Sequence, residues 1–262
     1  MNKAWRFIPY NDYDGCLNMA IDEALLELMR QGKIPFTLRL YGFKPSCVSF
    51  GYSQKIDRHF LDKLKLFNID YVRRPTGGRA VLHHNNLTYS FIGSSTNKVI
   101  SQSVVASYKQ ISAGIIKSYE KFGIELRTNN NENNFNKGLD CFDHLSRADL
   151  QANGQKIVGS AQLRRDNAIL QHGSINLYNQ NDSSKFIFKN LNLEEEQKLK
   201  DFILASNKQI TDNLIEIENA FIDGFSQTFN INFEILPLSA YELELAENIK
   251  IKYYLEPKLN LV

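Results

Sequence analysis

The sequence has 262 residues, of which 43% are hydrophobic and 23% are charged, a balance typical of a globular protein with a sizeable core. The formal net charge of +2 gives no general electrostatic case for nucleic-acid binding. No apolar run is long enough to span a membrane, and residues 1–10 contain no signal-peptide core. We therefore expect a single cytoplasmic domain, residues 1–262, that contacts neither nucleic acid nor membrane.

Hydrophobic periodicity predicts helices that alternate with clusters of short strands. The first helix starts at Asp14, a residue type that caps helix N-termini, and Gly32 follows its end. The predicted helices span residues 14–30, 55–66, 102–123, 193–204, 209–229 and 238–251. Residues 129–136 contain six asparagines, and we expect them to form a mobile surface loop.

The strand predictions depend on short apolar segments and the turn residues between them. Asn85 and Asn86 predict a hairpin between residues 79–84 and 87–93, and Asn153-Gly154 predicts a two-residue hairpin turn. The other predicted strands lie at residues 36–41, 46–51, 69–74, 157–162, 169–170, 175–177 and 231–236, with a turn at 165–167. This order predicts an α+β fold with a mixed, mostly antiparallel sheet and flanking helices.

A glycine turn follows the strand predicted at residues 69–74. It reads Arg73-Arg74-Pro75-Thr76-Gly77-Gly78-Arg79. Adjacent glycines let backbone N–H groups approach a ligand closely, and three arginines can attract negative charge or polarised carbonyls. The alternative is an ordinary hairpin turn with solvated arginines.

Lys156 and Cys141 are candidates for reactive chemistry. Lys156 follows a predicted turn and precedes the small residues 159–161, so it can be a fixed cation in a pocket or can lie on an exposed strand face. Cys141 lies in a polar run, and a nearby cation would lower its thiol pKa from about 8.5, although a lone cysteine is more often a buried apolar residue. Cys16 and Cys47 fall within predicted regular elements, and we interpret them as structural.

The histidines do not form a metal-ligand pattern. His83 and His84 end a predicted strand, and His172 lies in a polar segment where it can line a pocket or have a structural role. Because these sites are dispersed and lack carboxylate or thiolate partners at ligand spacing, we predict no metal site. The cysteines, odd in number and far apart, favour neither a disulfide framework nor a metal site.

Taken together, these segments resemble the catalytic domain of the biotin/lipoate protein ligase family. The run from Arg73 to His83 resembles that family's signature, and residues 18–24 resemble its first helix. Residues 153–162 and 171–174 resemble two further family segments in the same order. The resemblance implies an α+β catalytic domain of the class II synthetase and biotin ligase type.

Within the family, the closest resemblance is to the M-type octanoyltransferases. Cys141 stands where those enzymes carry their acyl-accepting cysteine, and Arg79 stands where lipoate ligases tend to have a third glycine. The last predicted helix ends near Tyr254, as in the M-type enzymes, and leaves no room for a separate accessory domain. One departure is His84, at a position where many relatives have an acidic residue.

The resemblance implies an octanoyl transfer that needs no ATP or other cofactor. The donor would be octanoyl-acyl carrier protein, and the acceptor a lysine of the glycine-cleavage H protein or an E2 lipoyl domain. Cys141 would carry the acyl group as a thioester, and Lys156 would assist it. The implied substrate-binding residues are Arg74, Gly77, Gly78, Arg79, His83, Ser160, Ala161, Gln162, His172 and Gly173.

Three alternatives remain open from the sequence. An ATP-dependent lipoate–protein ligase would have the same fold, and Cys141 would then be incidental. An amidotransferase would move the acyl group between lipoyl domains through a similar cysteine. A non-catalytic protein would use the same groove to bind the acyl carrier protein without turnover.

Overall fold

The computed structural model describes residues 4–96, 99–128, 149–176, 187–188, 191–205 and 213–254. Its helices are α1 (Gly15–Arg30), α2 (Arg58–Leu66), α3 (Val104–Glu120), α4 (Leu193–Ala205), α5 (Leu214–Phe229) and α6 (Ala240–Tyr253). Its strands are β1 (Trp5–Tyr13), β2 (Thr37–Phe43), β3 (Cys47–Phe50), β4 (Asp70–Arg73), β5 (Val81–His83), β6 (Leu87–Ser94), β7 (Arg127–Thr128), β8 (Leu150–Ala152), β9 (Gln155–Arg165), β10 (Ala168–Ile175) and β11 (Phe233–Ile235). The predicted Asn-rich loop and Cys141 lie outside the described residues.

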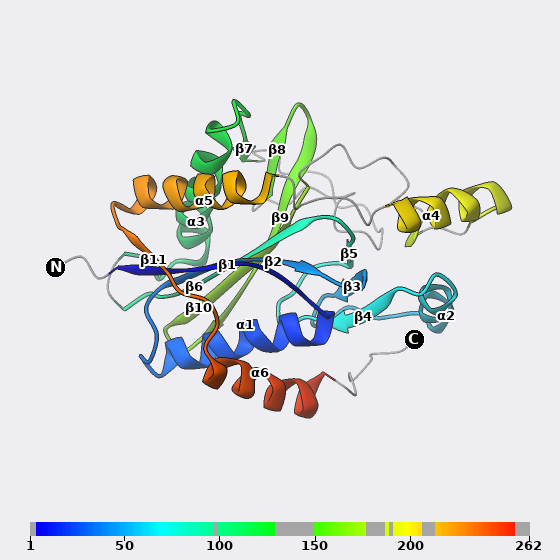
Figure 1. The fold of residues 1–262 in the computed structure, drawn as a ribbon, viewed down its shortest axis with the longest axis horizontal. Helices are drawn as coiled ribbons and strands as arrows, with labels where there is room; N and C mark the ends of the chain where they lie inside the picture. The colour runs from blue at the N-terminus through cyan, green and yellow to red at the C-terminus, as the bar shows by residue number, and fades with distance from the viewer. Residues whose placement is uncertain are drawn as a thin grey trace.

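A large central sheet is covered by helices on both faces (Figure 1). Its strand order is β11-β1-β2-β6-β10-β9-β8-β7, and a second sheet has the order β4-β3-β5. The pair α1 and α6 covers one face of the large sheet, and α3 and α5 cover the other (Figure 1). The smaller sheet and α2 lie toward one end of this sandwich (Figure 1).

The described strands pair in both directions. Antiparallel pairing joins β2 to β6, β6 to β10, β10 to β9, β9 to β8, β8 to β7 and β3 to β5. Parallel pairing joins β1 to β2, β1 to β11 and β3 to β4. This arrangement confirms the predicted α+β class and the mixed, mostly antiparallel sheet.

Local capping explains where the helices begin and end. The Asp14 side chain accepts a hydrogen bond from the N–H of Leu17 at 2.8 Å and starts α1 where predicted. The second helix starts at Arg58, later than predicted, because Asp57 caps it. The third is shorter than the predicted 102–123, since Ser103 caps its start and it ends at Glu120.

One predicted hairpin and one predicted turn are confirmed, and the other predicted hairpin is wrong. The turn at Asn153-Gly154 joins β8 to β9, both residues having positive φ, and the turn after Arg165 joins β9 to β10. In contrast, β5 pairs with β3, whereas β6 pairs with β2 and β10. The segment at Asn85 therefore carries the chain from one sheet to the other. Both strands are buried, so their side-chain pattern did not reveal which strands they would pair with.

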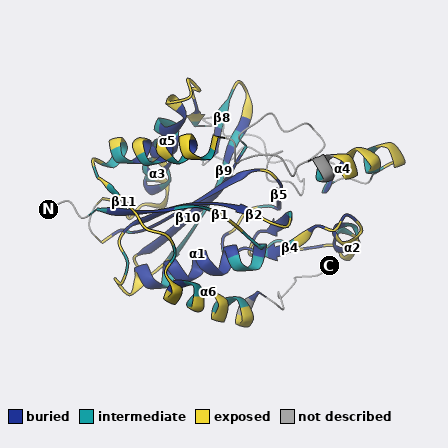
Figure 2. Ribbon diagram, in the orientation of Figure 1, coloured by how far each residue is buried: buried dark blue, intermediate teal, exposed yellow. Residues whose placement is uncertain are grey.

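The core consists of two groups of buried apolar side chains (Figure 2). The larger lies between the large sheet and its helices, where Trp5 packs against Phe36, Phe91 and Phe229 at ring-centroid separations of 4.8–5.6 Å. The smaller lies around the three-stranded sheet, α2 and α4. The site described below lies where the two sheets approach each other.

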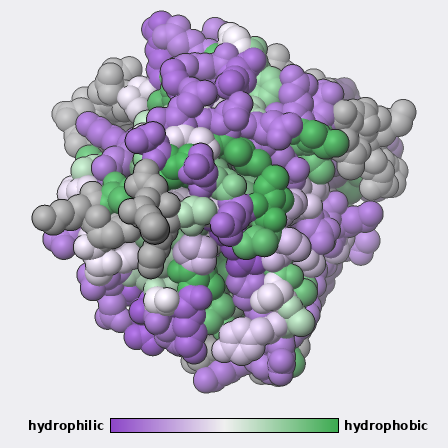
Figure 3. Space-filling view, turned by 60° about the vertical axis from the view of Figure 1, so that its left-hand side comes forward, coloured by the Kyte–Doolittle hydropathy of each residue, from purple (hydrophilic) through white to green (hydrophobic). Residues whose placement is uncertain are grey.

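The molecular surface is largely polar on the face seen in Figure 3, with hydrophobic residues gathered in patches near its centre. Exposed apolar side chains include Ile235 in β11 and Leu236 directly after it. As a short strand at the edge of the sheet, β11 offers few unpaired backbone groups to another chain. Among the described helices, none is both long and apolar enough to cross a lipid bilayer.

Candidate active site

A small pocket of about 50 Å³ lies between the glycine turn and strands β9 and β10. Helix α1 and strands β2, β3, β5 and β6 supply the rest of its wall. It is lined by Met19, Tyr41, Ser49, Arg74, Gly77, Gly78, Val81, His83, Thr88, Gly159, Ser160, Ala161, His172, Gly173 and Ser174. The structure thus brings together every substrate-binding residue predicted from the sequence except Arg79 and Gln162.

The buried side chain of Arg74 holds the glycine turn in place through hydrogen bonds to backbone carbonyls. Its guanidinium donates to the carbonyls of Ser49, Gly77 and Arg79 at 2.8–2.9 Å. These contacts give Arg74 a role in shaping the turn, beyond the substrate-binding role predicted from the sequence. Arg73 acts similarly on the neighbouring loop, where its Nη1 donates to three carbonyls, the nearest being that of Gly51 at 2.6 Å.

The carbonyls of the glycine turn face the protein. The N–H of Tyr52 donates to the carbonyl of Thr76 at 2.9 Å, and the carbonyl oxygen of Gly78 lies 1.8 Å from the position that a Cβ on Gly51 would occupy. A trans peptide directs its carbonyl opposite to the N–H of the following residue. The Gly77 N–H therefore points away from Tyr52, and the Gly78 N–H points away from Arg74, which donates to the Gly77 carbonyl at 2.8 Å. Within the described ranges, no group accepts a hydrogen bond from either N–H. They are therefore available to a ligand in the pocket.

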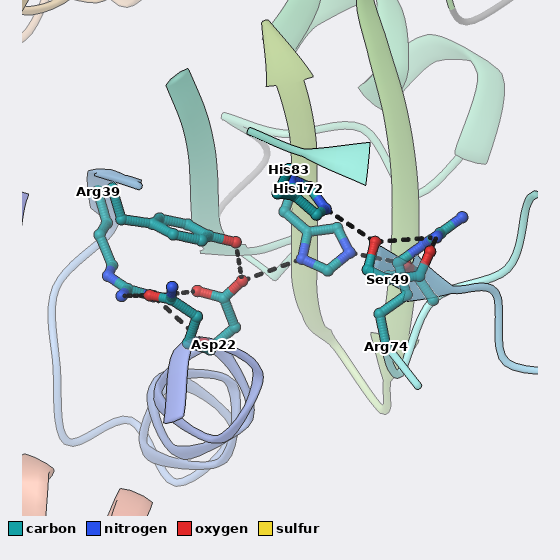
Figure 4. A network of polar contacts seen from close by, with 9 residues as sticks. Asp22, Arg39, Ser49, Arg74, His83 and His172 are labelled. Atoms are coloured by element: carbon teal, nitrogen blue, oxygen red, sulfur yellow. Dashed lines mark hydrogen bonds and ion pairs between the residues drawn. The ribbon is translucent and has the colours of Figure 1, made fainter. Parts of the chain in front are cut away.

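His172 connects the glycine turn to helix α1 (Figure 4). Its Nε2 lies 2.6 Å from Thr76 Oγ1, and its Nδ1 lies 3.0 Å from Asp22 Oδ2. Asp22 is fully buried and also accepts from Arg39 Nη1 at 2.8 Å and from the Tyr41 hydroxyl at 2.9 Å. Sequence reasoning included Asp22 in a family motif but assigned it no role.

The carboxyl group of Asp22 is held in its charged form. Burial alone would raise the pKa of Asp22, but the hydrogen bond from His172 and the positive charge of Arg39 outweigh that effect and lower it. The buried carboxylate therefore balances the charge of Arg39 and accepts hydrogen bonds from three sides.

His83 also lines the pocket, in a different environment from that of His172. Its Nε2 lies 2.8 Å from Ser49 Oγ, and its ring stacks on Phe43 with centroids 3.8 Å apart. Burial, with a smaller contribution from the positive charge of Arg74, places the pKa of His83 well below its usual range. His83 is thus a neutral polar group in the pocket wall at neutral pH.

Lys156 is buried, which excludes the exposed strand face considered from the sequence. Its Nζ lies 2.8 Å from Asp149 Oδ2, and the two side chains are only 3% and 2% exposed. The pairing of β8 with β9 skips Ile157, since Leu150 pairs with Val158 and Gln151 pairs with Lys156. This bulge turns Lys156 toward Gly159 in the pocket wall.

Gly159 makes room for that lysine. A Cβ at Gly159 would lie 2.9 Å from Lys156 Cε and 3.2 Å from its Nζ. The ammonium group therefore lies directly against the wall of the pocket. Asp149 was not identified from the sequence, because nothing in the local pattern shows that it would pair with Lys156 across the β8–β9 hairpin.

Gln162 lies outside the pocket, on the side of β9 that faces α3. Its amide donates to Ser107 Oγ at 3.2 Å and to Gln171 Oε1 at 3.0 Å. Ser160 does line the pocket, and its Oγ lies 2.8 Å from the Tyr89 hydroxyl. Alternate side chains of a strand share a face, so the side chains of Ser160 and Gln162 lie on the same side of β9 and that of Ala161 lies on the other.

The two described cysteines are poor nucleophiles. Burial, with a smaller contribution from Asp14, raises the pKa of Cys16 to about 11. Burial, with a smaller contribution from Asp70, raises the pKa of Cys47 well above its usual value. Both observations agree with the structural roles assigned to these residues from the sequence. As for metal ligands, the described part of the chain contains no group of three or more His, Cys, Asp or Glu side chains able to hold an ion.

The fold is similar to that of solved lipoate–protein ligases. A lipoate–protein ligase A bound with ATP has a TM-score of 0.74 and 23% identity, with 98% of each chain covered. A bipartite lipoate protein ligase from Thermoplasma acidophilum has a TM-score of 0.69 and 24% identity, covering 99% of this chain and 96% of the other. At these identities the similarity defines a class of fold.

The sequence matches are more specific. The family model of the lipoyl protein ligase A/B catalytic domain matches residues 14–231. The octanoyltransferase LipM of Clostridioides difficile is 36% identical over 259 residues, covering 95% of this chain and 96% of the relative. The LipM of Bacillus subtilis is 34% identical over 272 residues, covering 98% of both. The chain therefore belongs to the lipoyl protein ligase A/B catalytic domain family, which confirms the resemblance inferred from its motifs.

Proposed function

We propose that this chain is an octanoyltransferase of lipoate biosynthesis. It takes an octanoyl group from octanoyl-acyl carrier protein and attaches it to a lysine of a lipoyl-accepting protein, either the glycine-cleavage H protein or an E2 lipoyl domain. The observation that carries this proposal is the match, at 34–37% identity over nearly the whole chain, to relatives named octanoyltransferase LipM. The pocket with its buried lysine supports an acyl-transfer reaction independently.

The proposed reaction has two steps through Cys141. The Cys141 thiolate attacks the carbonyl carbon of the donor thioester, a new carbon–sulfur bond forms, and the carrier's thiol leaves with a proton. The acceptor lysine amine then attacks the Cys141 thioester, an amide bond forms, and the cysteine is released after the amine loses its proton. The high pKa values of Cys16 and Cys47 support the assignment of this role to Cys141.

The pocket groups have separate roles in this proposal. The ammonium group of Lys156 favours the thiolate and attracts the acyl carbonyl. The N–H groups of Gly77 and Gly78 donate to the oxyanion that forms during each step, and one such donor is typically worth about 3 kcal/mol. The octanoyl tail needs an apolar surface, and Val81 supplies one in the pocket lining. The neighbouring apolar side chains Leu82, Tyr89 and Phe91 belong to the two cores.

The proposal includes the remaining expectations from the sequence. Exchange of one thioester for another is near thermoneutral and amide formation is downhill, so the reaction needs neither ATP nor a cofactor. Residues 1–262 form one catalytic domain, and the enzyme works in the cytoplasm. Of the predicted site residues outside the pocket lining, Arg79 is the last residue of the glycine turn, and Gln162 lies on the same strand as Ser160 and donates to Gln171 of β10.

A second candidate is an ATP-dependent lipoate–protein ligase. The similarity in fold to a lipoate–protein ligase A bound with ATP favours it. In that case Lys156 and the glycine turn would hold an acyl-adenylate, and Cys141 would have no role. An amidotransferase would use Cys141 but would take its acyl group from another lipoyl domain.

The test is to mix the purified chain with octanoyl-acyl carrier protein and apo H protein, without ATP, and to record intact masses. We expect octanoylated H protein, together with an octanoyl adduct on the enzyme. Cys141→Ala should abolish both, whereas Cys16→Ala, the matched control, should retain both. Product that forms from free octanoate only when ATP is present, and that survives Cys141→Ala, would instead establish the ligase.

A further inference from the structure

Three buried residues from distant parts of the sequence form one hydrogen-bonded chain beside the pocket (Figure 4). Thr76 lies in the glycine turn, His172 in β10 and Asp22 in α1, and they are 1%, 4% and 0% exposed. The separations are 2.6 Å from Thr76 Oγ1 to His172 Nε2 and 3.0 Å from His172 Nδ1 to Asp22 Oδ2. None of the catalytic roles described above uses Thr76 or Asp22.

The charge on Asp22 sets the direction of the hydrogen bonds. A carboxylate can only accept, so the proton between Asp22 and His172 belongs to Nδ1 of the imidazole. In the neutral imidazole, Nε2 then carries a lone pair and accepts from the Thr76 hydroxyl. A hydroxyl, an imidazole and a carboxylate occur in the same order in serine hydrolases. Here, however, the hydroxyl is buried and lies outside the pocket lining, so Thr76 cannot attack a substrate.

The hydrogen-bonded network of Thr76, His172 and Asp22 joins two walls of the pocket, the glycine turn and β10. Arg74 ties the glycine turn to β3 through the carbonyl of Ser49, whereas the Thr76 side chain ties it to β10 and, through Asp22, to α1. The turn and β10 contribute Gly77, Gly78 and Gly173 to the pocket. The spacing between those walls therefore depends on the bond from Thr76 to His172.

We propose that Asp22, His172 and Thr76 are positioning residues that hold the glycine turn at the distance from β10 at which its N–H groups reach the acyl carbonyl oxygen. This inference rests on the proposed octanoyl transfer. Charge accumulates on that oxygen in the transition state, so the N–H groups contribute more there than in the bound substrate. Loss of the hydrogen bonds among Thr76, His172 and Asp22 should lower kcat and leave KM nearly unchanged.

The kinetic test compares Thr76→Val, which keeps the shape and removes the hydroxyl, with Thr76→Ser, which keeps the hydroxyl. Thr76→Val should lower kcat for octanoyl transfer by about tenfold or more with KM within about twofold, and Thr76→Ser should retain most of the activity. Thr37→Val is a matched control, because Thr37 is also buried and hydrogen-bonded, to Pro35, at the end of β2 away from the pocket. A Thr76→Val enzyme with wild-type kcat, or a Thr76→Ser enzyme as impaired as Thr76→Val, would overturn the proposal.

A second measurement does not depend on activity. Imidazole nitrogen NMR of the purified full chain should show His172 with its proton on Nδ1, and the Nε2 signal should move in Thr76→Val but stay in place in Thr37→Val. A proton on Nε2 of neutral His172 would overturn the inference that Asp22, His172 and Thr76 position the glycine turn, while leaving the proposed function intact. A wild-type enzyme that transfers no octanoyl group, with the expected NMR result, would instead defeat the proposed function and the catalytic part of this inference.

Discussion

Lys156 illustrates how one side chain is placed by its immediate neighbours. A buried ammonium group is costly unless a counter-charge compensates it, and Asp149 supplies that charge at 2.8 Å. The missing side chain at Gly159 leaves the space that the lysine occupies. The position of the cation therefore depends on a residue with no functional group of its own.

Gly159→Ala should displace the Lys156 ammonium group, because the added methyl group would lie 2.9 Å from Lys156 Cε. We expect kcat for octanoyl transfer to fall about tenfold or more, since a small misplacement of a catalytic group is costly. Steady-state kinetics with octanoyl-acyl carrier protein as the donor measures this change in kcat. Gly123→Ala is the control: it strains a backbone with φ of +70° away from any neighbour, so it should lower the melting temperature and preserve kcat. Unchanged kcat in Gly159→Ala would contradict the role of Lys156.

At the scale of the element, the glycine turn is shaped by the segments on which it packs. Two arginines bind its carbonyls and those of the adjoining loop, and Gly51 lets the Gly78 carbonyl approach the backbone. Backbone groups cannot move aside as the end of a flexible side chain can. The turn is therefore sensitive to any side chain added at Gly51.

Gly51→Ala should disrupt the turn, because its Cβ would lie 1.8 Å from the Gly78 carbonyl oxygen. We expect a loss of about 3 kcal/mol in the free energy of unfolding, together with a severe loss of octanoyl transfer. Urea denaturation and the mass assay measure the two effects. Gly32→Ala provides a comparison, since that glycine has φ of +68° and no atom near its Cβ position, and it should cost less stability and no activity. Equal effects of both substitutions would show that packing at Gly51 is unimportant.

At the scale of the whole molecule, a buried ion pair joins the two ends of the chain. Arg6 of β1 forms an ion pair with Glu242 of α6, and Arg6 Nη2 lies 2.9 Å from Glu242 Oε2. Glu242 also completes a capping box with Ser239 at the start of α6. Burial alone would raise the pKa of Glu242, but its bonds to Arg6 and Ser239 lower it below the usual value.

Glu242→Gln should cost about 3 kcal/mol of stability at neutral pH, because it leaves the buried Arg6 charge without its partner. The wild-type advantage should be complete above the unfolded-state pKa of about 4.3 and should disappear as pH falls through the lowered folded-state value. Urea denaturation of both proteins between neutral and acidic pH measures this. Glu125→Gln removes an exposed ion pair with Arg127 and should cause no measurable change in the free energy of unfolding. If the difference in unfolding free energy between the wild type and Glu242→Gln grew as the pH fell, the lowered pKa of Glu242 would be contradicted.

The sequence by itself determined the helices, the family, the turns at 153–154 and 165–167, and most of the longer strands after the first helix, because caps, turn residues and contiguous motifs are local properties. It did not predict the nine-residue β1. The sequence also identified most residues of the pocket, since the family motifs contain them. Only the tertiary structure decided that β5 and β6 belong to different sheets, that Lys156 is buried against Asp149, and that Gln162 faces α3. Those features depend on strand pairing and on a bulge at Ile157. The chain from Asp22 through His172 to Thr76 likewise arises only when α1, β10 and the glycine turn meet, because hydrogen bonds between distant segments leave no periodic pattern in the sequence.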